Sequence, residues 1–164
     1  MTGQVDSAAL PADTLLEPFR IEGGHSDCYV AEVPGAVDLA AFITAFYGSA
    51  AFRPERWLLG VLLGKGADAA DIAGLAAGKT ERFAAWTVEA RRADEILLCD
   101  YQHRTRSWLM VRPVAGGTRL HFGSAVVPAK ARAERLVFSA LLGFHAAYSR
   151  ALLGSAVRSL SQSA

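Results

Sequence analysis

The feature that most limits the folds open to this chain is a run of four strand-like segments between residues 82 and 128. In chain order they are RFAAWTVEA, EILLCDY, SWLMVRPV and TRLHFGSAVVP. Short polar joints separate them: RRAD and AGG are typical of hairpin turns, and YQHRT must contain the remaining turn. Strand-like segments in this close succession predict an antiparallel meander.

A long helix is expected after the meander. Residues from Ala131 to about Leu160 form an amphipathic pattern with apolar side chains at spacings of three and four. These apolar residues are Val137, Leu141, Phe144, Tyr148 and Leu152. Helices kept apart from a run of hairpins indicate an α+β fold. We expect a curved antiparallel sheet wrapped around the long C-terminal helix, because their apolar surfaces must cover each other.

The first half of the chain is expected to add one strand and shorter helices. HSDCYVAEVP, from His25, alternates like a strand. Asp38 can cap a helix through LAAFITAFYG, and a second helix is expected in ERWLLGVLLGK. DAADIAGLAAGK predicts a short third piece. The apolar stripe of the first of these helices is Leu39, Phe42, Ile43 and Phe46.

The chain is expected to form one domain with an N-terminal extension. A length of 164 residues suffices for one substantial core. Pro11 and Pro18 interrupt regular structure near the start, so residues 1–20 are predicted to be a mobile or loosely packed arm. Residues 21–164 are then the single domain.

Charge and apolar patterning argue against nucleic-acid and membrane partners. The 17 Lys and Arg residues nearly balance 16 Asp and Glu residues, without a basic block to attract phosphates. The longest apolar segment, Leu136 to Val157, contains His145 and Arg150, and charges inside a bilayer are costly. A buried helix of a soluble protein is expected there instead.

A cytoplasmic location is expected. The N-terminus lacks the basic region and apolar stretch of a signal peptide. Cys28 and Cys99 lie far apart in apolar, strand-like sequence. Two buried reduced thiols are favoured over a disulfide between them.

The tripeptide Gly78-Lys79-Thr80 raises the question of a phosphate-binding loop. That motif is G-x-x-x-x-G-K-[ST], but Ala73 stands where its first glycine belongs. The motif also follows a strand and enters a helix, whereas here a helical piece precedes and a strand follows. Gly78 is therefore expected to end a helix, and no nucleotide or other cofactor is predicted.

Three blocks in this order resemble a bacterial family of unknown function within the START-like, or SRPBCC, helix-grip superfamily. They are FYGSAAFRPERWLLGVLLGK, DYQHRTRSWLMVRP and RLVFSALLGFHAAYSRALL, the last with the Phe144-His145 pair. Relatives often have proline where this chain has Gly143. The resemblance implies the helix-grip fold and, because relatives also follow reductase-like nucleotide-binding domains, a redox-enzyme partner. It implies no activity.

A helix-grip fold encloses a cavity between sheet and helix, and such cavities hold apolar molecules with a few polar anchors. Alternation puts Arg106, Trp108 and Met110 on one face of their strand, and His121 opposite Leu120 and Phe122. If Trp108 points inward, Arg106 lies at one mouth of the cavity. The candidate ligand-binding residues are Asp100, Arg106, Trp108, Met110, His121, Phe144, His145 and Tyr148.

Structural roles compete with these assignments. Asp100 and Arg106 could pair across their hairpin, His145 could be a core histidine, and His103 and Arg104 are expected to be exposed. The four histidines have no partner at metal-ligand spacing, so no zinc site is predicted.

Three functions stay open. The first is a binding module for a hydrophobic or aromatic small molecule. The second is a cyclase-, isomerase- or hydratase-like enzyme in which Asp100, His121 and His145 meet for acid–base chemistry. The third is a structural or dimerisation role without a ligand, which includes a homodimer.

Overall fold

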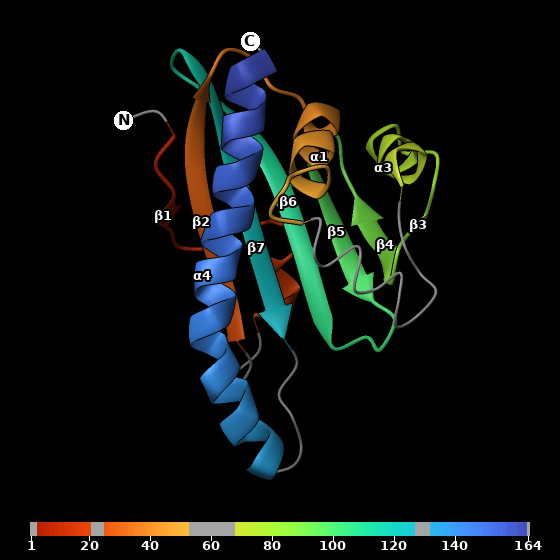
Figure 1. Cartoon of the computed structure of the whole chain (residues 1–164), viewed down its shortest axis with the longest axis vertical. Helices are drawn as coiled ribbons and strands as arrows, with labels where there is room; N and C mark the ends of the chain where they lie inside the picture. The colour runs from red at the N-terminus through yellow and green to blue at the C-terminus, as the bar shows by residue number, and fades with distance from the viewer. Residues whose placement is uncertain (1–2, 21–24, 53–67, 127–131, 164) are drawn as a thin grey trace.

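The computed structural model describes residues 3–20, 25–52, 68–126 and 132–163, with side chains undescribed for 132–144 and 163. Its centre is a seven-stranded antiparallel sheet in the order β1-β2-β7-β6-β5-β4-β3 (Figure 1). The strands are β1 (Asp6–Ser7), β2 (His25–Pro34), β3 (Arg82–Phe83), β4 (Trp86–Arg91), β5 (Glu95–Asp100), β6 (Thr105–Val114) and β7 (Gly117–Val126). The helices are η1 (Glu17–Phe19), α1 (Leu39–Tyr47), α3 (Ala69–Ala76) and α4 (Arg132–Ser163). The α+β prediction is confirmed.

Local signals place the described helices as the sequence predicted. Asp38 caps α1 by accepting a hydrogen bond from the backbone N–H of Ala41 at 2.7 Å. Gly78 follows α3 with a φ of 68°. The backbone N–H groups of Gly78 and Lys79 donate to the carbonyls of Leu75 and Gly74, which is a Schellman motif. The GKT tripeptide therefore ends a helix.

One predicted strand is divided in the structure, and one predicted helix lies outside the described residues. The segment RFAAWTVEA is not one strand: the chain turns at Ala84, whose φ is 51°, so that β3 pairs back on β4. The sequence pattern did not reveal this turn because neither alanine between the strands is a typical turn residue. The helix expected in ERWLLGVLLGK lies outside the described residues.

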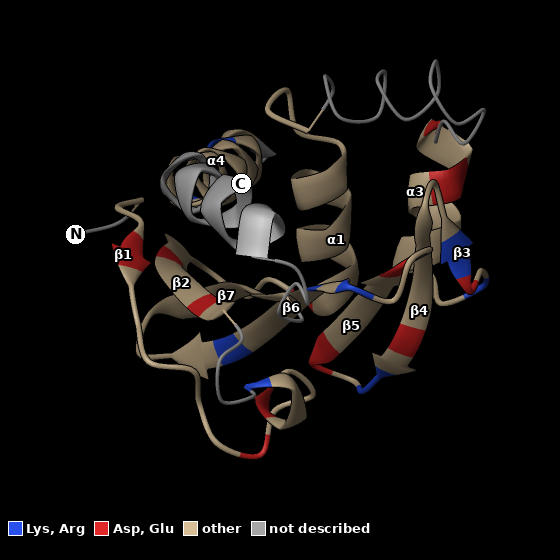
Figure 2. Cartoon of the chain, turned by 90° about the horizontal axis from the view of Figure 1, so that it is seen from below, with Lys and Arg blue, Asp and Glu red and all other residues tan. Residues whose placement is uncertain are grey.

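Helices cover one face of the sheet, which we call the inner face. Figure 2 shows α1, α3 and α4 together on this side, with α4 over β2 and β7. The main core lies here and includes Phe42, Ile43 and Phe46 of α1, which are at most 1% exposed. Leu98, Leu109 and Leu120 reach this core from three neighbouring strands.

The opposite, outer face carries a second core. Leu97, Trp108 and Met110 are all buried on this side, and Leu16 of the N-terminal segment covers them. The structure thus differs from the loosely packed arm expected for residues 1–20: β1 pairs with β2, and Leu16 is 0% exposed. In Figure 2 the chain after β1 runs beneath this face.

Gly123 of β7 allows this segment to approach the sheet. A Cβ atom at this position would lie 2.8 Å from Leu16 Cδ2 and 2.9 Å from Trp108 Cε3. Such distances are shorter than carbon–carbon contact permits. The outer core therefore depends on the missing side chain.

The buried carboxylate of Glu95 holds the N-terminal segment against the outer face through hydrogen bonds. Glu95 is 2% exposed. Its Oε2 accepts hydrogen bonds from the Leu15 backbone N–H at 2.9 Å and from Trp108 Nε1 at 2.7 Å. Its Oε1 accepts from Arg92, which also donates to the carbonyl of Asp13. One side chain thus joins the segment, the β4–β5 turn and the outer core.

No helix within the described ranges is both long enough and apolar enough to cross a bilayer.

We expect Glu95→Ala to lower the free energy of unfolding by about 3 kcal/mol, because it leaves two buried N–H groups without an acceptor. Glu95→Gln should cost only about 1 kcal/mol, since its amide oxygen can still accept both and only the partly exposed Arg92 contact is lost. Urea unfolding of the two variants measures the difference. Equal losses would show that Glu95 contributes through charge instead of through these two acceptor contacts.

Candidate functional site

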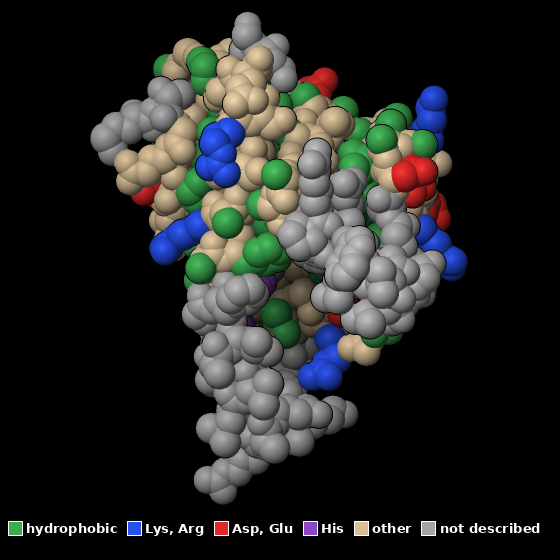
Figure 3. Space-filling model, in the orientation of Figure 1, with side chains coloured by type: hydrophobic (Ala, Val, Ile, Leu, Met, Phe, Trp, Pro, Cys, Tyr) green, Lys and Arg blue, Asp and Glu red, His purple; other side chains and the backbone are tan. Residues whose placement is uncertain are grey.

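A pocket of about 190 Å³ opens between α1, α4 and the inner face of β6 and β7. Six aromatic side chains line its described wall: Phe46, Tyr47, Phe52, Trp86, Phe122 and Tyr148. In the space-filling view, hydrophobic and histidine side chains show in the wall of a hollow beside α4 (Figure 3). The pocket has the composition of a site for an apolar molecule.

Helical spacing brings one face of α4 into this wall. His145, Tyr148, Ser149 and Leu152 all line the pocket. They lie at positions i, i+3, i+4 and i+7, which share one side of an α-helix. Of the predicted apolar stripe, Leu152 is buried and Tyr148 is partly buried, whereas the side chains of Val137, Leu141 and Phe144 lie outside the described set. His145 reaches the pocket from the same side of the helix.

Three polar side chains form a connected cluster at one end. Antiparallel pairing sets Asp27 of β2 directly opposite Ser124 of β7. The Ser124 hydroxyl donates to Asp27 Oδ1 at 2.7 Å, and the Ser124 backbone N–H donates to the same oxygen at 3.0 Å. Nε2 of His145 lies 2.7 Å from Ser124 Oγ and 3.5 Å from Asp27 Oδ2. The cluster therefore joins the sheet to α4.

The electrostatics of this cluster favour an ionised Asp27. Burial alone would raise the pKa of this carboxyl, but hydrogen bonds with His145 and Ser124 outweigh burial and hold the pKa below its ordinary value. His25 adds a further nitrogen 3.7 Å from Asp27 Oδ2. Its ring meets that of His145 edge to face, with centroids 6.3 Å apart.

The geometry differs from that of a serine nucleophile. In a catalytic triad the carboxylate binds Nδ1 of histidine while the serine binds Nε2. Here both Asp27 and Ser124 lie at Nε2 of His145, and the serine donates its proton to the carboxylate. The cluster can hold or transfer a proton, but it does not activate Ser124 for attack.

A further serine contributes an unpaired hydroxyl. Ser149 is 0% exposed, and its Oγ has no hydrogen-bond partner among the described residues. A buried hydroxyl without a partner is costly and uncommon in folded proteins.

Trp108, Met110 and His121 lie on the other side of the sheet from the pocket. Trp108 and Met110 belong to the outer core, and the Trp108 and His121 rings meet edge to face at 6.0 Å. Trp108 does not point inward, so the condition under which Arg106 would lie at a cavity mouth is not met. Alternation correctly groups residues by face, but β6 is apolar on both faces, so the pattern alone does not say which one the helices cover.

His121 is a buried neutral histidine. Burial, and then the charges of Arg112 and Arg119, lower its pKa to about 4. Neither ring nitrogen has a hydrogen-bond partner among the described residues. The acid–base set of Asp100, His121 and His145 is therefore not assembled by this fold.

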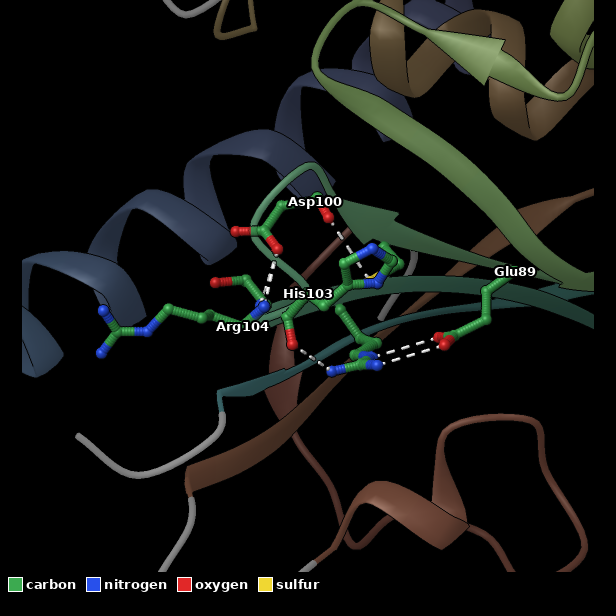
Figure 4. A network of polar contacts seen from close by, with 7 residues as sticks. Glu89, Asp100, His103 and Arg104 are labelled. Atoms are coloured by element: carbon green, nitrogen blue, oxygen red, sulfur yellow. Dashed lines mark hydrogen bonds and ion pairs between the residues drawn. The ribbon is translucent and has the colours of Figure 1, made fainter. Parts of the chain in front are cut away.

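Asp100 and Arg106 each have structural partners, and they do not pair as the sequence suggested. Asp100 Oδ1 accepts from the backbone N–H groups of Arg104 and Thr105 in the β5–β6 turn (Figure 4). Arg106 instead forms an ion pair with Glu89, with both N···O distances 3.1 Å. Its guanidinium also lies 4.4 Å from the Phe19 ring centroid on the outer face. Arg106 thus reaches the pocket wall without bringing its charge into it.

The β5–β6 turn forms a separate surface hollow. Asp100 and His103 line it together with Arg82 and Tyr101. His103 and Arg104 are exposed, as predicted, and the φ of His103 is 57°. Phe144 lies in the part of α4 whose side chains are outside the described set.

The described residues contain neither a disulfide nor a cluster of possible metal ligands. Both cysteines are buried free thiols, as predicted, and burial followed by the charge of Asp27 raises the pKa of Cys28 to about 12. Burial also raises the pKa of Cys99. No group of three or more His, Cys, Asp or Glu side chains within the described ranges could hold a metal ion.

Sequence reasoning missed Asp27, Ser124 and Ser149. Alternation put Asp27 on the same face as Tyr29, and a carboxylate within an apolar strand is a signal that could have been followed. Its neighbour Ser124 is 97 residues away, and only the pairing of β2 with β7 brings them together. Ser149 follows His145 by one helical turn, which a search of that helix face would find.

Comparison of the chain with protein-family models, curated proteins and solved structures gives no match in any of the three. The resemblance to START-like domains stays a prediction from the sequence.

The contribution of Asp27 to the free energy of unfolding should depend on pH. Because its folded pKa is lowered, its contribution to stability is complete above the unfolded pKa of 3.8 and is lost as the pH falls through the folded value. Asp27→Asn should therefore be less stable than the wild type near pH 7, and the difference should shrink below about pH 4. Urea unfolding across this pH range measures it. A difference that does not change with pH would contradict the assignment.

Proposed function

We propose that this chain binds a hydrophobic small molecule in the inner pocket. The observation that carries the proposal is the aromatic wall that α1, α4 and the sheet form around a cavity. A cavity of this kind favours apolar ligands, because contact with such walls removes their surface from water. The polar cluster at one end can orient the ligand.

The size of the pocket narrows the choice of ligand. Its volume of about 190 Å³ is slightly above the roughly 150 Å³ of an engineered apolar cavity that binds benzene. It is below the roughly 300–1,000 Å³ of sites for drug-sized molecules. We therefore propose a ligand with about one substituted ring, and we do not favour steroid-like molecules.

The arrangement also supports the helix-grip assignment as a proposal. A long C-terminal helix lies over the inner face of an antiparallel sheet, and the pocket lies between them. The redox-enzyme partner and the cytoplasmic location stay predictions from the sequence.

Acid–base catalysis is the second candidate function. It is favoured by one observation: His145 lines the pocket while Ser124 and the ionised Asp27 support it from behind. A histidine held in this way is suited to accept or donate a proton. This catalysis requires a bound ligand, so the binding test comes first.

We expect toluene to bind the wild-type protein in an NMR titration, and a four-ring steroid such as testosterone not to bind. Ser149→Leu adds apolar volume inside the pocket. It should weaken toluene binding about tenfold or more, which is the scale of one surplus methylene in an apolar site.

Ser155→Leu is the matched control, because Ser155 is a buried serine of the same helix that does not line the pocket. It should leave toluene affinity unchanged. Failure of every one-ring probe to bind, with the protein folded, would reject the binding proposal and favour a structural or dimerisation role.

A further inference from the structure

The hydrogen bonds of Ser124 indicate which ring nitrogen of His145 carries a proton. Ser124 has one hydroxyl proton, and it donates this proton to Asp27 Oδ1 at 2.7 Å. The Ser124 oxygen must then accept from His145 Nε2, which lies 2.7 Å away. Nε2 therefore carries the proton.

The opposite arrangement is unfavourable. If Ser124 donated to Nε2, two oxygen atoms 2.7 Å apart would face each other with no proton between them. An ionised carboxylate can only accept. The lowered pKa of Asp27, in which hydrogen bonds with His145 and Ser124 outweigh burial, keeps it ionised at neutral pH. Asp27 and Ser124 thus act as positioning residues for the ring.

When the His145 imidazole is neutral and protonated at Nε2, its Nδ1 is an acceptor. Nδ1 has no hydrogen-bond partner among the residues that the structure describes. One turn further along α4, the unpartnered hydroxyl of Ser149 belongs to the same pocket wall. On the described face of α4, Nδ1 of His145 and the hydroxyl of Ser149 are therefore available to a ligand.

The wall also disfavours an anion. Arg106 is the one Lys or Arg among the described residues of the wall, and its guanidinium is bound to Glu89 and stacked on Phe19. Among the described residues of the wall, a carboxylate or phenolate would find ionised Asp27 nearby but no Lys or Arg side chain without a partner.

We propose that the pocket selects an uncharged ring compound bearing a hydroxyl group, of the phenol class. The ligand O–H donates to Nδ1 of His145, and its oxygen accepts from Ser149 Oγ. The proposal rests on the proposed function, because it specifies the ligand of that same pocket.

Phenol and toluene test it as a matched pair, since they differ only in O–H against CH3. The wild-type protein should bind phenol at least as tightly as toluene in NMR titrations. His145→Phe should reverse this order to about a tenfold preference for toluene, as expected when a hydroxyl is buried in apolar surroundings without a strong partner. His103→Phe, at an exposed histidine outside the pocket wall, should keep the wild-type order.

Ser149→Ala adds a second comparison. It should weaken phenol binding relative to toluene binding, because it removes a hydrogen bond that only phenol can make. Ser155→Ala should change neither affinity.

Nitrogen-15 NMR of the wild-type imidazole rings gives a readout that needs no variant. His145 should show a protonated Nε2 and an unprotonated Nδ1, and Nδ1 should shift on addition of phenol but not of toluene. A protonated Nδ1 would overturn the proposal. A tenfold preference of the wild type for toluene would overturn it and leave the binding pocket standing, whereas binding of neither probe would reject both.

Discussion

The structure depends on one constraint: the central strands carry apolar side chains on both faces, so the sheet must be covered twice. Leu98 and Leu109 point to the inner side, while their neighbours Leu97 and Trp108 point to the outer side. Helices α1 and α4 cover the first face, and the N-terminal segment covers the second. The outer cover is thin, so a buried carboxylate, Glu95, fastens it by accepting hydrogen bonds from both the segment and Trp108. Burial of apolar surface supplies the driving force, and this contact fixes the position.

The candidate site follows from how the inner face is covered. Helix α4 passes over β2 and β7, and the register of these strands puts Asp27 opposite Ser124. His145 then meets both from the helix. Polar groups inside a core are usually hydrogen-bonded, and each one that is not needs an explanation. Asp27, Ser124 and His145 satisfy one another in part, whereas the Ser149 hydroxyl has no hydrogen-bond partner among the described residues. This unpartnered hydroxyl is the reason for proposing that the pocket holds a molecule.

Much of the fold could be predicted from local patterns. The Asp38 cap, the glycine that ends α3 and the alternation along β6 and β7 each depend on a few neighbouring residues. Two features were not predicted, because they depend on contacts between residues far apart in the sequence. Alternation grouped Trp108 with Met110 but could not say that the N-terminal segment, with its two prolines, would cover them. Asp27 is an unusual residue for an apolar strand and Ser124 an ordinary one, but both acquire a role only through strand pairing across the chain.

Gly123 links these two parts of the molecule. Leu16 and Trp108 press on it from the outer side, and the next residue along the strand is Ser124 of the polar cluster. A side chain at position 123 would also strike the carbonyl oxygen of Asp27, at 2.8 Å. Protein interiors are densely packed and pass displacements on to their neighbours. The residues that hold the ring of His145 are thus braced from behind by a segment that never enters the pocket, and the two faces of the sheet form one mechanical unit.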